Sequence, residues 1–226
     1  MKFPRRDFWL HSIMCVTGGF LGAYALLCRD YNFGNAQTVN LIQLFTCVLG
    51  RNFFEFFLRF LGFVLYVGAI LIYIYLDKKT EINLERYAVL VNLAGVVLLA
   101  FLPQNINPVV GILPIFFMMS TQWSVFHGIG EYNSSTIFST NNIRQCTLGF
   151  GNYLISKDKK SLEKGKFFGN SLLWYHLGVV LSFFSCRYFG VKASLCAIPI
   201  VIIALCLTFQ TEHSYIAKKK IIKAKA

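Results

Sequence analysis

Six long apolar stretches constrain what this chain can fold into. They run approximately over residues 8–28, 53–76, 87–102, 109–129, 167–186 and 194–209, and all are lightly charged. A helix rises about 1.5 Å per residue, so roughly 20 residues cross a hydrocarbon core about 30 Å thick. A water-soluble domain with 56% hydrophobic and 14% charged residues would expose too much apolar surface. We therefore expect an all-α, polytopic integral membrane protein.

The first stretch follows Arg5 and Arg6, so a cleaved signal peptide is an alternative for it. The apolar run continues through Gly18 and Gly22 to Arg29 without a convincing small-residue cleavage site. We expect an uncleaved first membrane span.

Two shorter apolar segments carry polar motifs at their starts. Residues 36–43 read AQTVNLIQ and residues 138–145 read FSTNNIRQ, and about ten apolar residues follow in each case. Ten residues reach only about half the thickness of the hydrocarbon core. The sequence therefore predicts six full spans plus two short interrupted helices, with eight full spans as the alternative.

The distribution of Lys and Arg does not separate these two topologies. Both place the two termini in the cytoplasm, because basic residues are enriched there in either case. They differ at the loop DKKTEINLER, residues 77–86, which is inside with six spans and outside with eight.

The two polar motifs also indicate an internal repeat. Aligning Thr38 with Thr140 brings Asn40 onto Asn142 and Gln43 onto Gln145, and sets residues 18–24 opposite residues 120–126. We expect two four-helix repeats, residues 1–102 and 103–226, within a single membrane domain. An odd number of full spans in each repeat makes the two copies opposite in orientation.

A helix that begins inside the membrane leaves backbone N–H groups without partners, at a cost of several kcal/mol each. We expect Asn40 and Asn142 to be N-caps, with Gln43 and Gln145 reaching back as in a capping box. Thr38 and Thr140 would bond the preceding backbone. Two such helix starts near one central region form the geometry of a binding site. In the alternative interpretation, these polar groups only form hydrogen bonds with one another between helices.

The motifs resemble those of the YoaK-type family, bacterial inner-membrane proteins of unknown function. That family shows Gly-Gly-x-x-Asp-Ala, then Phe, then Thr-Gly-Asn, and in its second half Gly-Met-Gln-Asn before another Thr-Gly-Asn. The matching positions here are Gly18, Gly19, Ala23, Phe33, Thr38, Asn40, Gln122, Thr140 and Asn142. Gly22 stands where the family has Asp, so its most obvious intramembrane proton carrier is missing. The resemblance implies a membrane protein suspected of transport.

Three further residues within apolar sequence are candidates for function. Arg144 could receive an anionic group, pair with Glu131 or extend to the membrane interface. His127 and His176 lie within predicted spans, where each is either a proton or ligand contact or a neutral ring bonded to another helix. The His, Cys and carboxylate spacings indicate no metal site, and we expect no cofactor.

The net charge of +12 does not require nucleic acid as a partner. The C-terminal sequence IAKKKIIKAKA favours retention in the cytoplasm beside anionic lipid headgroups. No nucleic-acid-binding motif is present in the sequence. The expected partners are the lipid bilayer and a small polar or anionic solute, and a homodimer is a further option.

These features predict a small-solute transporter or exporter in the bacterial inner membrane, with a midplane site between the repeats. The expected substrate-binding residues are Thr38, Asn40, Gln43, Gln122, Thr140, Asn142, Arg144 and Gln145. The alternative is a non-transporting membrane subunit that binds a partner or supports assembly. We do not expect an enzyme, because no catalytic triad, carboxylate pair or metal-ligand cluster is evident.

Overall fold

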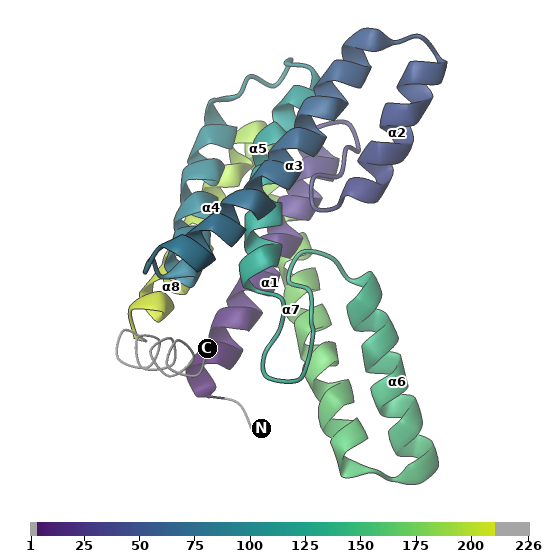
Figure 1. Cartoon of the computed structure of the whole chain (residues 1–226), viewed down its shortest axis with the longest axis vertical. Helices are drawn as coiled ribbons and strands as arrows, with labels where there is room; N and C mark the ends of the chain where they lie inside the picture. Colours follow the sequence, from purple (N-terminus) through teal and green to yellow (C-terminus); the bar gives the residue numbers. More distant parts are fainter. Residues whose placement is uncertain (1–3, 211–226) are drawn as a thin grey trace.

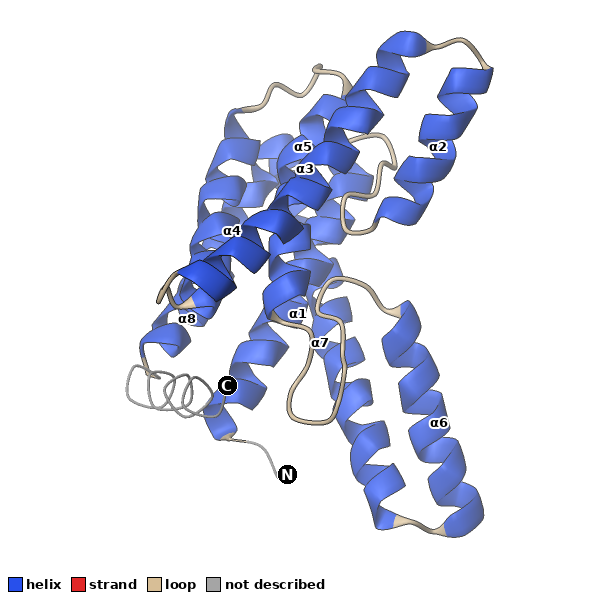
Figure 2. Cartoon of the chain, in the orientation of Figure 1, coloured by secondary structure: helices blue, strands red, loops and turns tan. Residues whose placement is uncertain are grey.

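The computed structural model describes residues 4–210, and helices account for most of them (Figure 1). The elements are α1 (Arg5–Cys28), α2 (Gln37–Leu49), α3 (Phe53–Lys79), α4 (Leu84–Phe101), α5 (Pro108–Val125), α6 (Thr140–Ser156), α7 (Lys159–Phe189), the 3-10 helix η1 (Gly190–Ala197) and α8 (Ile198–Phe209). Figure 2 shows helices joined by loops, and within residues 4–210 the one β-type pairing is an isolated bridge between Ile129 and Tyr132. The all-α prediction is confirmed. The basic sequence IAKKKIIKAKA lies outside the described residues.

Among the described residues, five helical segments are long and apolar enough to cross a membrane. Four are α1, α3, α4 and α5, and the fifth, Lys159–Phe209, joins α7, η1 and α8 over 51 residues. At about 1.5 Å per residue, this segment is far longer than a hydrocarbon core of roughly 30 Å is thick. The chain turns after α7 at Gly190, whose φ of 53° suits glycine, and α8 runs back toward the end where α1 begins (Figure 1). The protein is polytopic.

Contacts of Arg6 identify which segments share one end of the molecule. Its guanidinium donates to Glu85 at the start of α4, and its Nε donates to Leu207 O at the end of α8 over 3.1 Å. Arg86 also lies 4.0 Å above the Phe209 ring. The loop between α3 and α4 is therefore at the same end as the start of α1. This is the six-span arrangement, and the eight-span alternative does not fit it.

Two helix boundaries differ from those expected from hydropathy. α7 begins at Lys159 and not near residue 167, because Asp158 caps it by accepting from the backbone N–H groups of Lys160 (3.1 Å) and Ser161 (2.9 Å). Hydrogen bonds from the Ser161 hydroxyl and backbone lower the pKa of Asp158. α5 ends at Val125, before residue 129, because Gly128 has a φ of 146° that no helix contains.

Helices α2 and α6 both begin near the middle of the molecule and run toward opposite ends (Figure 1). Each packs against the helix that follows it, α3 or α7. The first helix of each predicted repeat, α1 or α5, packs against the third helix of the other, α7 or α3. The fourth helices, α4 and α8, pack against α5 and α1. The division into two repeats stays a prediction; if it holds, the corresponding helices of the two repeats make equivalent contacts.

Helix α1 forms the centre of the bundle, and small residues allow its close approach to α7. A Cβ atom on Gly19 would lie 1.9 Å from Tyr175 O, and one on Gly178 would lie 2.1 Å from Val16 O. Gly18 faces the backbone of Thr136, where a Cβ atom would lie 2.0 Å from the carbonyl oxygen. The Gly18-Gly19 pair is therefore needed for backbone contact on two sides of α1.

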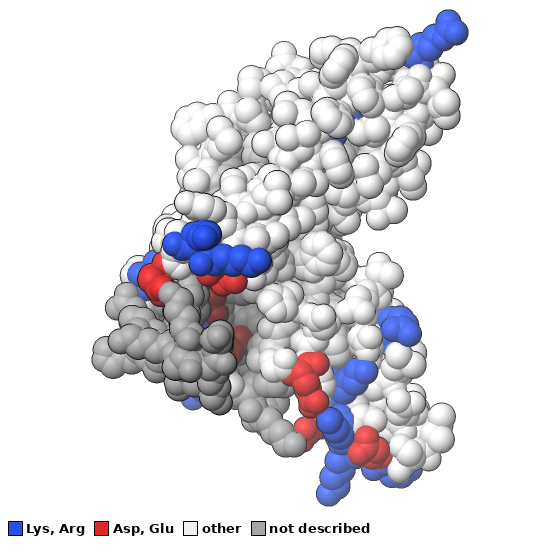
Figure 3. Space-filling model, viewed as in Figure 1, with Lys and Arg blue, Asp and Glu red and all other residues white. Residues whose placement is uncertain are grey.

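Charged side chains gather at one end of the molecule. Figure 3 shows Lys, Arg, Asp and Glu on the face toward the viewer mainly in its lower part, where α1 begins and α3 and α6 end. The opposite end of this face is largely free of charge (Figure 3). We refer to the charged end as the lower end, and to the other as the upper end.

Candidate functional site

The two interrupted segments touch each other at the centre of the bundle. Asn35, in the loop before α2, is fully buried. Its Nδ2 donates to Gly18 O and to Ile137 O, both over 2.8 Å, and Ile137 belongs to the loop before α6. Sequence reasoning did not identify Asn35, although a polar residue directly ahead of a half-length helix was a signal for it.

The predicted N-caps are wrong. Both helices begin earlier, at Gln37 and Thr140, and the side chains at the actual caps, Ala36 and Ser139, accept no hydrogen bond from the helix. Asn40 and Asn142 are buried within the first turns and serve the surrounding backbone instead. Asn40 Nδ2 donates to Gln37 Oε1 (2.8 Å) and to the carbonyl of Arg59 (3.2 Å), and Asn142 Nδ2 donates to the carbonyl of Ser135 (2.7 Å).

The capping-box prediction for the two glutamines is also wrong. Gln43 Oε1 accepts from Arg59 Nη1 over 2.6 Å, so Gln43 connects α2 to α3. Gln145 lines a cavity described below. Thr38 and Thr140 are exposed. The side chains of the motif therefore do not cap either helix start, because the motif residues already lie inside the helix.

We call the start of α2 with the loop before it the first break, and the start of α6 with its preceding loop the second break. Arg59 binds the polar side chains of the first break, and sequence reasoning missed this role. Besides Gln43 it contacts Asn32 Oδ1 (3.5 Å), and its Nη2 lies 3.8 Å from Glu55 one turn away on α3. Glu55 in turn accepts from Asn107, the N-cap of α5. An arginine within the apolar sequence FFEFFLRFLGF was the available signal.

Gln122 is fully buried and joins four parts of the molecule. Its Nε2 on α5 donates to Met14 O of α1 (2.8 Å) and to Thr136 Oγ1 (3.1 Å), and its Oε1 accepts from Asn92 of α4 (2.6 Å). All of these partners are protein groups, so Gln122 stabilises the bundle. The predicted substrate residues therefore lie in three separate places, the α2–α3 contact, the centre and the start of α6, and share no single chamber.

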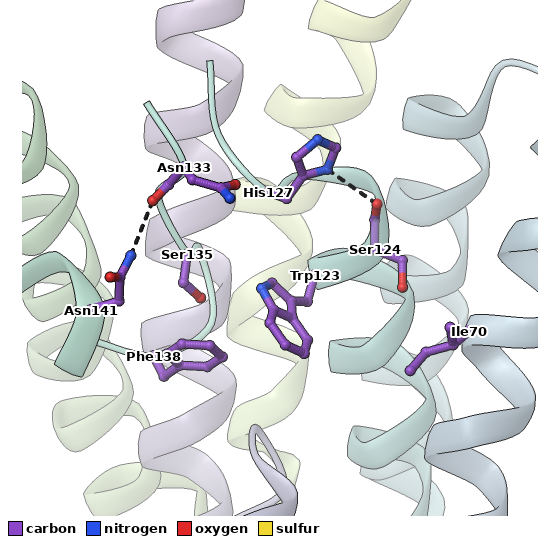
Figure 4. A pocket seen from close by; sticks show the side chains of 8 residues that line it. All are labelled: Ile70, Trp123, Ser124, His127, Asn133, Ser135, Phe138 and Asn141. Carbon is purple, nitrogen blue, oxygen red and sulfur yellow. Dashed lines mark hydrogen bonds between the residues drawn. The ribbon is translucent and has the colours of Figure 1, made fainter. Parts of the chain in front are cut away.

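An open cavity of about 450 Å³ lies beside the second break (Figure 4). We call it the solute cavity, and it is lined by Ile70, Trp123, Ser124, His127, Asn133, Ser135, Phe138 and Asn141. The Trp123 and Phe138 rings meet edge to face, with centroids 5.4 Å apart. Asn141 Nδ2 donates to Asn133 O over 3.0 Å. Aromatic faces and amide groups thus face one space.

The two histidines proposed from the sequence differ in position. His127 lines the solute cavity, with Nδ1 3.3 Å from Ser124 O (Figure 4). His176 is exposed on α7, and its Nδ1 lies 2.8 Å from Leu172 O of its own helix. A ligand contact fits His127, whereas the position of His176 is that of a helix-bonded surface ring.

A second cavity, of about 620 Å³, lies between the first turns of α6, the first turns of α7 and the loop before α6. We call it the basic cavity, and its lining is Glu131, Tyr132, Asn133, Asn141, Gln145, Lys160, Lys164 and Phe168. Glu131 pairs with Lys160 over 3.2 Å, not with the exposed Arg144. Burial, with the Glu131 carboxylate nearby, raises the pKa of Tyr132. Asn133 and Asn141 line both cavities and separate them.

A buried polar cluster contacts the loop 126–139 between α5 and α6, and sequence reasoning did not find it. His11 of α1 is 3% exposed, and its Nε2 lies 3.2 Å from Ser134 Oγ and 3.3 Å from Ser171 Oγ. Ser134 donates to Asn142 Oδ1 over 3.1 Å. The loop 126–139 is therefore held by α1, α6 and α7 together.

A protein-family model described as "Protein of unknown function (DUF1275)" matches residues 10–209, almost the whole of the chain. The chain belongs to this DUF1275 family. The resemblance to a family of unknown function seen in the motifs is confirmed at this level. No curated protein and no solved structure matches the chain.

One departure from the YoaK-type motif can now be placed in this DUF1275 protein. Gly22, where that motif has Asp, lies directly beside Asn35 and Tyr175 at the centre of the bundle. A Cβ atom there would be 2.8 Å from Asn35 Nδ2 and 3.1 Å from Tyr175 Oη. A longer side chain at Gly22 would therefore require the side chains of Asn35 and Tyr175 to shift. Residues 4–210 also form no cluster of three His, Cys, Asp or Glu side chains that could hold a metal ion.

Proposed function

We propose that this DUF1275 protein is a small-solute transporter or exporter, and that its solute binds in the solute cavity. The observation that carries the proposal is the contact between the two interrupted segments, with an open cavity of about 450 Å³ directly beside one of them. Irregular backbone at membrane depth is tolerated where it is buried or lines a cavity. Transporters commonly bind substrate at such interrupted helices.

The lining of the solute cavity supports a small polar or anionic organic solute. Its volume is within the usual range of roughly 300–1,000 Å³ for ligand sites. Trp123 and Phe138 offer ring surfaces, while Asn133 and Asn141 offer amide groups. Asn141 is in the first turn of α6, where the positive end of the helix dipole favours an anionic group.

Contacts at the upper end support a state closed on that side. Arg29 is 1% exposed, and its Nη1 and Nη2 donate to Pro103 O (2.7 Å) and Leu102 O (3.1 Å) just after α4. Tyr24 Oη donates to Val191 O of η1 over 2.9 Å. In this proposal the solute enters from the lower end, and movement of the α6–α7 hairpin against α1 exposes the cavity alternately to the two sides.

The proposal includes a location in the bacterial inner membrane with the lower end in the cytoplasm. The start of α1 and the loops after α3 and α6 carry most of the Lys and Arg at the ends of the described helices, as the positive-inside rule requires. A cysteine replacing exposed Ile82 should resist an impermeant thiol reagent added to intact cells, whereas one replacing exposed Tyr31 should react. Labelling at position 82 and not at position 31, each compared with the parent protein, would reverse the orientation.

The transport proposal is tested by a solute screen on the purified protein in lipid nanodiscs. A true ligand at about 100 times its Kd stabilises the fold by roughly 2.7 kcal/mol, which a thermal-unfolding scan detects. Trp123→Leu and Asn141→Leu should each abolish this stabilisation. Their matched controls are Trp9→Leu on α1 and Asn152→Leu at the far end of α6, both outside the solute cavity. If the controls also lost the stabilisation, the effect would not depend on binding in the solute cavity.

One observation favours the alternative of a non-transporting assembly subunit. Gln122 and Asn142 have protein partners throughout, as expected if the motifs only hold helices together. The same screen separates the two functions. If no solute stabilises the protein and one other protein co-purifies in stoichiometric amount, the assembly role replaces transport.

A further inference from the structure

The buried His11 cluster is not used by the proposed solute site, although it contacts the same loop. His11 Nε2 faces the hydroxyls of Ser134 and Ser171, and its ring stacks on Phe167 with centroids 5.5 Å apart. Its Nδ1 is buried and has no hydrogen-bond partner. A buried polar atom without a partner is costly, so this one requires an explanation.

The hydrogen bonds around His11 determine which ring nitrogen carries the proton. The Ser134 hydroxyl donates to Asn142 Oδ1 or to Ser171 Oγ, each 3.1 Å away, and Ser171 donates to Phe167 O (3.2 Å), so both hydroxyl protons point away from His11. Both hydroxyl oxygens are therefore acceptors toward His11, and Nε2 is the donor. Nδ1 is left as an unprotonated base.

A third cavity is lined both by His11 and by charged residues of the lower end. It has a volume of about 160 Å³, and its lining is Arg6, Asp7, Leu10, His11, Glu85, Val125, Phe126, Gly128, Ile129 and Gly130. We call it the lower cavity. It has room for several water molecules at roughly 30 Å³ each, and its polar groups can bond them.

We propose that His11 is a proton-binding site, in which Nδ1 takes up a proton from water in the lower cavity and the resulting imidazolium loosens the loop 126–139. The proton comes from solvent at the lower end and returns there, so no other reactant is needed. Asp7 and Glu85, both held by Arg6, lie along this cavity and can pass the proton between water molecules.

The groups that surround His11 determine the effect of the added charge. From α1 these are Arg6, Asp7 and, one turn farther on, the Cys15 thiol beside Ser171; from the start of α4, Glu85. The loop presents Ser134 and α7 presents Ser171, and both are neutral. The cluster therefore suits a neutral ring, and an imidazolium buried there is costly unless water reaches it. Displacing the loop admits that water, so proton uptake favours the displaced loop.

This site is linked to the solute cavity through a single loop. Ser134 contacts His11, while its neighbours Asn133 and Ser135 line the solute cavity. The inference that proton uptake is coupled to solute movement rests on the proposed transport function. The proton site itself does not, because protonation and loop displacement are measurable without a solute.

The test uses the full chain in lipid nanodiscs, with ¹⁵N-labelled histidine rings observed by NMR between about pH 7.5 and about pH 3.5, because burial disfavours the charged ring. His11→Gln identifies the His11 signals. We expect Nε2–H with a bare Nδ1 at the upper pH, and protonation of Nδ1 on acidification. The opposite tautomer, or a ring that stays neutral until the fold is lost, would overturn the proposal. If His11→Gln does not fold, substitutions of the other three histidines, His127, His176 and His213, by Gln identify the His11 signals by elimination.

Hydrogen exchange of the loop amides supplies the second readout. After correction for the intrinsic pH dependence of exchange, we expect the loop 126–139 to exchange roughly tenfold faster in the acidic state of the wild type. His11→Gln keeps an N–H donor for the serines and cannot take up the proton, so its loop should show no such change. His176→Gln, on the exposed face of α7, should behave as the wild type. A loop that responds equally in His11→Gln would exclude His11 as the cause.

These results are separable from the solute screen. A titrating His11 with a responding loop and no stabilising solute keeps the proton site and removes the transport proposal. A stabilising solute with a His11 that never titrates keeps transport and removes the proton site.

Discussion

The two interrupted segments carry nearly the same motif, and their surroundings differ. At the first break, Asn40 and Gln43 are engaged with α3, and Arg59 fills the space between α2 and α3. At the second break, Asn141 and Gln145 face cavities on the two sides of the loop 126–139. The first break therefore behaves as a fixed joint, and the second has the open space that a ligand or a moving loop needs.

The length of the preceding loop explains much of this difference. Only residues 29–36 separate α1 from α2, whereas residues 126–139 separate α5 from α6. The longer loop includes Gly128 and Gly130, both at positive φ, and runs toward the lower end before returning to the start of α6 (Figure 1). A repeated motif can thus keep its position in the fold while its function changes, because the adjoining loop sets the space around it.

The largest expected effect is at the contact between the two breaks. Asn35→Leu removes both hydrogen bonds of the buried amide and leaves Gly18 O and Ile137 O without this donor. Each loss costs about 1–3 kcal/mol, so we expect a decrease of roughly 3 kcal/mol or more in the free energy of unfolding. The measurement is denaturant unfolding in mixed micelles. Asn152→Leu, exposed near the end of α6, is the control and should change stability by less than about 0.5 kcal/mol.

A loss at Asn35 as small as that of the control would show that the breaks do not support each other. Each interrupted segment would then be stable without the contact between them, and Asn35 would not link the two.

The next largest effect concerns the first break alone. Arg59→Met keeps the length of the side chain and removes the donors to Gln43 and Asn32. Hydrogen bonds to a charged group contribute about 1.5–3 kcal/mol, and we expect a destabilisation of roughly 2 kcal/mol with unchanged stabilisation by a bound solute. Arg51→Met, at the exposed turn between α2 and α3, is the matched control. If Arg59→Met abolished solute binding and left stability intact, the first break would belong to the site.

The sequence predicted the positions of the spans and of the two shorter helices, because apolar length and the polar motifs report directly on the membrane environment. The expected short helices, residues 41–50 and 143–153, coincide with most of α2 (Gln37–Leu49) and with the middle of α6, which at 17 residues is longer than the half-length expected. The partners of the motif residues were not predictable in the same way. Asn142 bonds a loop whose path depends on α1 and α7, and Gln122 meets groups from three other segments. Such contacts depend on tertiary packing, which local spacing does not specify.

The smallest expected effect is at Arg144, on the second break. Its side chain is exposed on α6, and Glu131 is paired with Lys160 instead. Arg144→Met should therefore change the free energy of unfolding by less than about 0.5 kcal/mol, measured as for Asn35→Leu. A loss near that of Arg59→Met would indicate that the second break is also fixed by a buried cation. An arginine would then hold α6 in the same way as Arg59 holds α2, and the two breaks would not differ as described.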